Sequence, residues 1–201
     1  SDSYSVKACD SYSDSTHAVT TNTTAGMKFI RTYGLYNELI LVKLRDPSSG
    51  NQNFYRKKAF SQITSGSRMR FVKTSDKVYP TEVTTDTGFN QTQWSYTYHS
   101  SDALQVKKRT TTLPVVATGE NGSNSAVTPT DYFSLDGLWN WTKDGDGFVH
   151  YMGYDSQRQT LTKTVRNIDT DTADRPSGVP APPSGEGFDS STGLNIVTDY
   201  E

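Results

Sequence analysis

Residues 93–99 read Gln-Trp-Ser-Tyr-Thr-Tyr-His, and this stretch decides the fold class. Its aromatic residues, Trp94, Tyr96 and Tyr98, stand at every second position, with polar residues between them. Successive side chains of a β-strand point to opposite faces, so this spacing predicts a strand with one apolar face and one polar face.

Further strand-like runs lie on both sides of this stretch. Residues 38–44, Glu-Leu-Ile-Leu-Val-Lys-Leu, predict a buried strand that ends at the turn sequence of residues 46–51. No stretch combines a helical period with capping residues. Many short strands between turns rich in Gly, Asn, Asp and Ser predict an all-β fold, an antiparallel β-sandwich or barrel. The other predicted strands cover residues 53–60, 69–73, 103–107, 113–118, 132–141, 148–154 and 159–165.

Two polar segments flank this body, which we place at residues 26–166. Residues 1–25 contain 14 Ser, Thr or Asp residues and no apolar period. Residues 167–201 hold four of the eight prolines, and their seven acidic residues face one basic residue, Arg175, for a formal charge of −6. Such segments bury too little apolar surface to offset their ordering entropy. We therefore predict extended polar N- and C-terminal arms.

The charge distribution makes the body and the arms complementary. The chain as a whole has a formal charge of −2, whereas the body alone carries 18 basic and 12 acidic residues, a charge of +6. A 35-residue arm can reach a neighbouring subunit, since an extended chain spans roughly 3.1 Å per residue. We predict assembly contacts at an apolar patch near the C-terminus and at basic residues of the body: Leu194, Ile196, Val197, Tyr200, Arg56, Lys57, Lys58, Arg68 and Arg70.

The sequence offers no recognisable catalytic constellation. It contains no nucleophile elbow, zinc-protease motif, phosphate-binding loop or dinucleotide fingerprint. The histidines His17, His99 and His150 are far apart, and the single cysteine, Cys9, lies in a polar segment that shelters a thiolate poorly. Residues 144–147, Asp-Gly-Asp-Gly, favour a hairpin turn over a calcium loop, because the fifth ligand position would be a phenylalanine. We predict no enzymatic activity, no cofactor and no metal.

Membranes and nucleic acids are not expected partners. The longest apolar run, residues 39–42, is far too short to span a bilayer, and the first residues show no signal-peptide pattern. The chain is acidic overall, whereas dedicated nucleic-acid binders are basic.

These observations leave three hypotheses for the function. The plan of a β-rich body between polar arms resembles that of viral and phage structural proteins, which implies a subunit of a virion (coat, cement or tail) that binds copies of itself or other subunits of the particle. The alternative is an extracellular carbohydrate-binding module that stacks sugars on exposed aromatics. The third is an enzyme or small-ligand carrier with a polar pocket around His99 or His150. Stacking candidates for the alternative are Trp94, Tyr96, Trp139 and Trp141.

Overall fold

The computed structural model describes residues 3–6, 9–13, 18–21, 28–34, 39–45 and 50–200, with side chains from residue 29 onward. In this part of the chain the regular structure is β-strand, apart from one short 3-10 turn, η1 (Thr118–Glu120). The strands are β1 (Ser3–Val6), β2 (Cys9–Ser13), β3 (Ala18–Thr21), β4 (Lys28–Tyr33), β5 (Leu39–Arg45), β6 (Gln52–Ser65), β7 (Arg68–Val78), β8 (Asn90–His99), β9 (Asp102–Thr112), β10 (Thr130–Phe133), β11 (Trp139–Lys143), β12 (Val149–Tyr154), β13 (Leu161–Arg166) and β14 (Ile196–Asp199). The predicted all-β class is confirmed.

Strand pairing follows chain order almost throughout. Hydrogen-bonded neighbours run β1-β4-β5-β6-β7-β8-β9-β10-β11-β12-β13-β14, and β2 pairs with β3 in a separate two-stranded sheet. The registered pairs are antiparallel, as short hairpin connections require. In this order β1 and β14 each have one neighbour, so the sheet is open, and the predicted sandwich or barrel is not confirmed.

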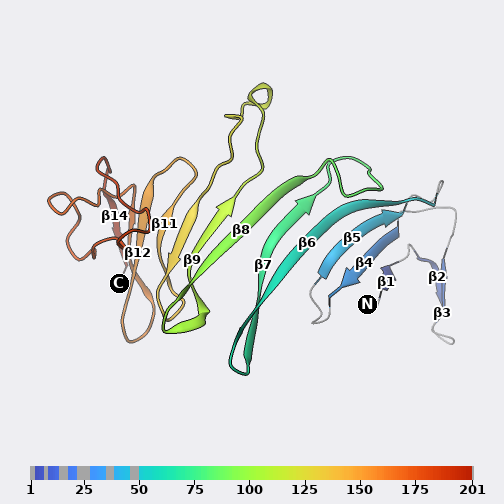
Figure 1. The fold of residues 1–201 in the computed structure, drawn as a ribbon, viewed down its shortest axis with the longest axis horizontal. Helices are drawn as coiled ribbons and strands as arrows, with labels where there is room; N and C mark the ends of the chain where they lie inside the picture. Colours follow the sequence, from blue (N-terminus) through green and yellow to red (C-terminus); the bar gives the residue numbers. More distant parts are fainter. Residues whose placement is uncertain are drawn as a thin grey trace. The chain divides into compact units, whose positions relative to one another are not determined.

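The chain forms two compact units, which we describe separately. Unit 1 comprises residues 1–61 and 73–92, and unit 2 comprises residues 62–72 and 93–201. The strands β6, β7 and β8, which are labelled in Figure 1, therefore contribute residues to both units. The hairpin turn between β6 and β7, in unit 2, begins with Gly66 at a φ of 59°, as a two-residue turn between twisted strands requires.

Two buried or half-buried carboxylates organise the charges of unit 1. Asp76 accepts hydrogen bonds from Arg56 through Nε (2.8 Å) and Nη2 (2.7 Å). Asp86 accepts hydrogen bonds from Lys57 Nζ (2.6 Å), Lys77 Nζ (3.0 Å) and the Tyr79 hydroxyl (2.5 Å). Asp86 thereby ties the loop that follows β7 back onto β6 and β7.

Aromatic packing joins the same loop to β6. The ring of Tyr79, which is 5% exposed, lies 5.2 Å from that of Phe54 and 5.8 Å from that of Phe89. The Phe54 N–H donates a hydrogen bond to Val83 O at 2.8 Å. Residues 79–89 therefore form a strap on unit 1, held by rings, backbone and the Asp86 carboxylate.

The hydrophobic core of unit 2 takes residues from β11–β13 and from the C-terminal segment. Trp141, Val149, Tyr151 and Val165 come from the strands, and Tyr132 of β10 packs against them. The remaining core residues are Ile168, Val179 and Phe188, of which Ile168 and Phe188 have no exposed surface. The segment that composition predicts to be a polar arm thus supplies three of the seven core residues. In this chain it covers one face of its own sheet.

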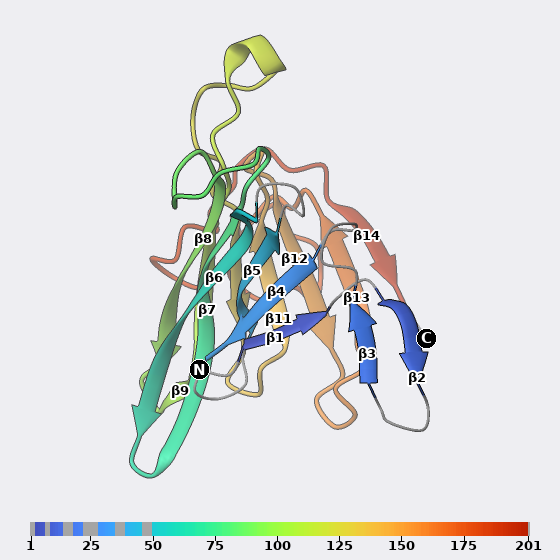
Figure 2. The same ribbon diagram turned by 90° about the vertical axis from the view of Figure 1, so that its right-hand side faces the viewer.

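The C-terminal segment has no apolar period, and backbone and side-chain hydrogen bonds hold it in place. The Ile168 N–H donates to Val149 O at 2.8 Å, and Thr170 and Ser190 bond each other through backbone and hydroxyl. Gly193 crosses the backbone of residues 167–169 so closely that a Cβ atom there would overlap it. The chain then adds β14 to β13, with Val165 opposite Val197 (Figure 2).

The predicted N-terminal arm, residues 1–25, is described only in part. Its backbone forms β1, which pairs with β4, and the β2–β3 hairpin. Its other residues, including His17, lie outside the described residues. The boundaries predicted at residues 25/26 and 166/167 therefore stay predictions.

Candidate functional site

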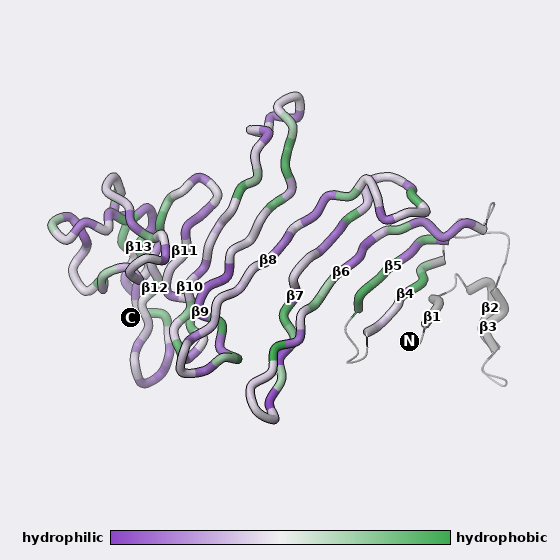
Figure 3. Tube along the Cα trace, in the orientation of Figure 1, coloured by the Kyte–Doolittle hydropathy of each residue, from purple (hydrophilic) through white to green (hydrophobic). Residues whose placement is uncertain are grey.

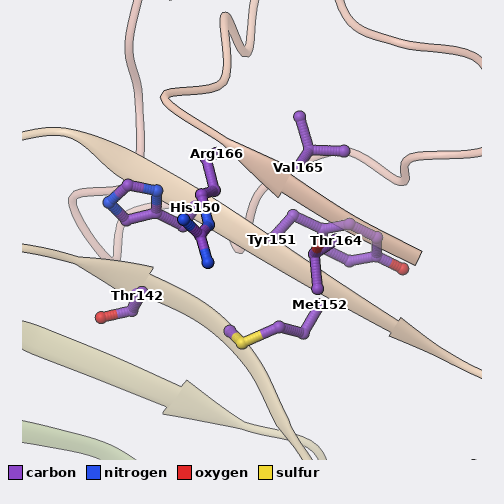
Figure 4. Close-up of a pocket in the computed structure, with 7 residues that line it drawn as sticks. All are labelled: Thr142, His150, Tyr151, Met152, Thr164, Val165 and Arg166. Carbon is purple, nitrogen blue, oxygen red and sulfur yellow. The ribbon is translucent and has the colours of Figure 1, made fainter. Parts of the chain in front are cut away.

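A pocket of about 350 Å³ lies on β11, β12 and β13 in unit 2. Along these strands the side chains alternate, so that Trp141, Tyr151 and Val165 enter the core while their neighbours point to the other face. The pocket, which we call the outer groove, is therefore formed mainly by the face of the sheet that the C-terminal segment leaves uncovered (Figure 4). Its lining residues are Thr142, His150, Tyr151, Met152, Thr164, Val165 and Arg166.

His150 lies at one end of the outer groove with both ring nitrogens engaged. The Asn167 N–H donates to His150 Nδ1 at 3.1 Å, which leaves the proton of a neutral ring on Nε2. That proton is donated to Asp144 Oδ2 at 3.0 Å. Neither nitrogen is left to exchange a proton with a molecule in the groove, so His150 here acts as a link between the β11–β12 turn and the end of β13.

Asp144 also caps the predicted hairpin turn, which is confirmed. Its Oδ1 accepts hydrogen bonds from the N–H groups of Asp146 (3.0 Å) and Phe148 (2.9 Å), and its backbone N–H donates to Phe148 O. Burial acts to raise the pKa of Asp144, but the hydrogen bonds from His150 and these two N–H groups together hold it below the usual value. Both oxygens of the Asp144 carboxylate thus bind groups of the fold itself.

The rest of the outer groove combines an apolar surface with one cation. Met152 supplies a thioether, and the Thr142 hydroxyl is turned to Asp131 Oδ1 at 3.0 Å. Arg166 is exposed, and its guanidinium has no hydrogen-bond or ion-pair partner among the described residues. An apolar group that carries or adjoins an anion is the kind of molecule that such a surface suits.

The predicted apolar patch gathers at β14. Leu194 is 74% exposed, Ile196 53%, Val197 42% and Tyr200 47%. All four lie on or beside an edge strand whose single hydrogen-bonded neighbour in the described sheet is β13. The strand β14 therefore pairs within the chain and leaves these side chains at the surface, and their role as assembly contacts stays a prediction.

The predicted basic residues are spread over both units, and four of the five have partners within their own unit, 20 to 34 positions away in sequence. Arg56 and Lys57 bind Asp76 and Asp86 in unit 1. In unit 2, Arg68 pairs with Asp102 at 3.4 Å and Arg70 donates to Leu104 O at 2.9 Å. Lys58 is half-buried on β6. None of these recorded acceptors belongs to the acidic C-terminal segment.

The acidic segment has ion pairs of its own in unit 2. Glu186 lies between Lys107 Nζ (2.6 Å) and Lys108 Nζ (2.5 Å), and Asp199 lies 3.3 Å from Lys163 Nζ. The hydrogen bond from Lys107, with that from Lys108, lowers the pKa of the Glu186 carboxyl. Within the described chain, these two acids therefore bind lysines of β9 and β13 rather than the predicted basic residues.

The predicted stacking residues do not form one surface. Trp94 and Tyr96 are half-buried on one face of β8, as their alternation predicts, and Trp139 is 41% exposed. Trp141 is 3% exposed in the core and cannot stack on a ligand, so its assignment as a stacking residue is wrong. Trp139 and Trp141 differ in burial because the register with β10 shifts between them.

Sequence reasoning named His150 for a polar pocket but missed the other residues of the outer groove and the core residues of the C-terminal segment. Met152, Thr164 and Arg166 belong to no motif. The only available signal was the alternation within the predicted strands 148–154 and 159–165, and Arg166 lies just beyond the second of these. Val179 and Phe188 are isolated among Pro, Gly and Ser, so no period marks them. Among the residues that the structure describes, no three His, Cys, Asp or Glu side chains are placed as metal ligands, and no helix is long and apolar enough to span a membrane.

Comparisons with known proteins do not assign the chain to a family. No protein-family model matches the chain, and a search of curated proteins finds no match to it.

Proposed function

We propose that this protein is a non-enzymatic structural subunit of a large assembly, a virion component such as a coat, cement or tail protein. The observation that carries the proposal is the open, apolar edge strand β14. The partners are copies of the chain or other subunits of the same particle. The location is the virion.

An exposed edge strand presents unpaired backbone groups to any other strand, and proteins usually protect it with charges, proline or cover. β14 carries one charge, Asp199, and all four of its residues are exposed. Ile196 and Val197 point to opposite faces, so both sides of the edge are apolar. Cover by a neighbouring subunit removes this liability.

In the proposed assembly, the second layer of the predicted sandwich would come from a neighbouring subunit. The C-terminal segment covers one face of β11–β13, and the other face holds the outer groove. In the proposed assembly a neighbouring subunit lies on this second face and supplies the second layer that a sandwich requires.

The test is the mass of the full chain in solution, measured by size-exclusion chromatography with light scattering and by negative-stain imaging. We expect a defined oligomer, ring, tube or shell. The variant Ile196→Lys should weaken it, because a lysine on an edge strand opposes further pairing. The matched control is Leu135→Lys on the β10–β11 connection, since Leu135 is 51% and Ile196 53% exposed. A wild-type chain that stays a 22.3 kDa monomer at high concentration and forms no particles contradicts the proposal.

A second candidate is an extracellular carbohydrate-binding module. It is favoured by the half-buried strip of Trp94 and Tyr96 on β8 and by the exposed Trp139. Binding on a glycan array that Trp94→Ala abolishes, and that Tyr55→Ala preserves in unit 1, would support it. If the wild-type chain binds no glycan, this candidate fails.

A further inference from the structure

A hairpin of unit 2 presents aliphatic side chains to solvent. Residues 113–127 extend β9 and β10 beyond their paired part, and we call this hairpin the apolar finger (Figures 1 and 3). Its limbs are joined by hydrogen bonds from Leu113 N to Val127 O (2.9 Å) and from Asn124 N to Val116 O (3.0 Å). Leu113 is 38% exposed, Val115 55% and Val116 44%. A run of exposed aliphatic side chains on a projecting hairpin is costly in water unless it meets a partner.

The apolar finger has a defined conformation. At its tip, η1 is closed by hydrogen bonds from Glu120 N and Gly122 N to Ala117 O. A Cβ atom on Gly122 would overlap the backbone of Val116, so only glycine allows the two limbs to approach this closely. At its base, Val127 lies so close to Gly145 that a side chain there would meet it. The valines are therefore held in fixed positions, which reduces the entropy lost on binding.

The apolar finger and the outer groove both expose apolar side chains and carry opposite charges. The groove, at about 350 Å³, has the volume of a small binding site, which is roughly 300–1,000 Å³. Arg166 stands exposed in the groove lining, and Glu120 stands exposed at the finger tip. Neither charged group has an ion-pair partner among the described residues.

We infer that the apolar finger of one copy docks into the outer groove of a second copy. Val115 and Val116 contact Met152 and the stem of Arg166, and the Glu120 carboxylate accepts hydrogen bonds from the Arg166 guanidinium. Because the two surfaces differ, the contact is head-to-tail and repeats from copy to copy, which produces a ring or a filament. The inference rests on the proposed function, to which it adds the partner and the symmetry of one contact.

Charge reversal tests the contact in the full chain. Glu120→Arg and Arg166→Glu each place like charges in the interface, and each should weaken association by about tenfold or more. The two variants mixed together should assemble again in a 1:1 ratio, since each finger then meets a groove of opposite charge. Asp136→Arg, an exposed acid between β10 and β11, is the matched control and should assemble like the wild type. Unchanged tryptophan fluorescence would verify that the variants are folded.

The outcomes separate this inference from the proposed function. Assembly that withstands both charge reversals but is lost in Ile196→Lys overturns the finger contact and leaves the structural role in place. Two variants that fail singly and also fail when mixed overturn it as well. A wild-type chain that never associates overturns both.

Discussion

Replacing Phe188 by alanine should remove a large part of the stability of unit 2. Its ring has no exposed surface, and its centre lies 6.2 Å from that of Tyr132 and 6.4 Å from that of Trp141. Truncating a fully buried phenylalanine typically costs about 3–5 kcal/mol, through lost burial and the cavity left behind. A typical domain has about 5–15 kcal/mol of stability in total, so this change is severe.

Urea unfolding followed by tryptophan fluorescence measures the loss of stability in unit 2. All three tryptophans, Trp94, Trp139 and Trp141, belong to unit 2, so the signal reports on that unit alone. The urea concentration at the midpoint of unfolding should fall for Phe188→Ala. Proteolysis should cut residues 167–195 sooner in this variant than in the wild type. Loosening of this segment precedes or accompanies unfolding, because the segment is one wall of the core.

The matched control is Phe148→Ala in the β11–β12 turn, where the ring is 46% exposed. This change removes the same atoms outside the core, and we expect a loss below about 1 kcal/mol. If Phe188→Ala is no more destabilising than Phe148→Ala, the C-terminal segment does not form part of the core, and the prediction that residues 167–201 are an extended polar arm is restored.

Three further changes test other contacts. Asp86→Asn removes a charged acceptor shared by three donors and should destabilise the strap of unit 1 by about 1–3 kcal/mol, seen as faster hydrogen exchange in residues 79–89. Glu186→Gln should destabilise unit 2 at pH 7, and the difference from the wild type should vanish in acid. The folded pKa of Glu186 is lowered, so its contribution is complete above the unfolded pKa of about 4.3 and is lost as the pH falls through the folded value; a pH-independent difference in urea midpoint would contradict this. Gly193→Ala should force the backbone of residues 167–169 away and detach β14, which limited proteolysis would detect, whereas Gly119→Ala, at a position with free space and without a positive φ, serves as the control for a glycine change.

Local periodicity and turn chemistry predict most strands of unit 2 but not all of their bounds. The predicted strand at 113–118 is wrong, because these residues form an irregular limb and the start of η1, and the predicted strand at 132–141 is divided into β10 and β11. The alternation of Trp94, Tyr96 and Tyr98 appears in β8 as half-buried aromatics between the exposed Ser95 and Thr97. The sequence Asp-Gly-Asp-Gly appears as the turn between β11 and β12, because Asp144 caps backbone N–H groups and Gly147 adopts a φ of 91°. Both features depend on neighbours within a few residues, which a sequence displays directly.

Composition alone cannot predict the packing of the C-terminal segment. Its Pro, Gly, Ser and Asp content is that of a linker, yet Ile168, Val179 and Phe188 each enter the core from an irregular loop. Asn195 shows how such a loop is ordered: its side chain accepts from Asp169 N at 2.8 Å and donates to Asp174 O at 2.9 Å. These contacts join residues that are 21 and 26 positions apart, and no repeating pattern links them. A local sequence pattern therefore cannot predict them.

The packing of this segment also determines which experiment can test assembly. An exchanged arm would ordinarily be tested by removal of residues 170–201, which should leave a folded body that no longer assembles. In the structure that truncation deletes Val179 and Phe188 from the core and exposes Trp141, so a loss of assembly would follow from unfolding alone. Substitutions at Ile196, Glu120 and Arg166 avoid this ambiguity, because all three side chains are exposed and none belongs to the core. An assembly defect that these changes produce without altering tryptophan fluorescence can only arise at the surface.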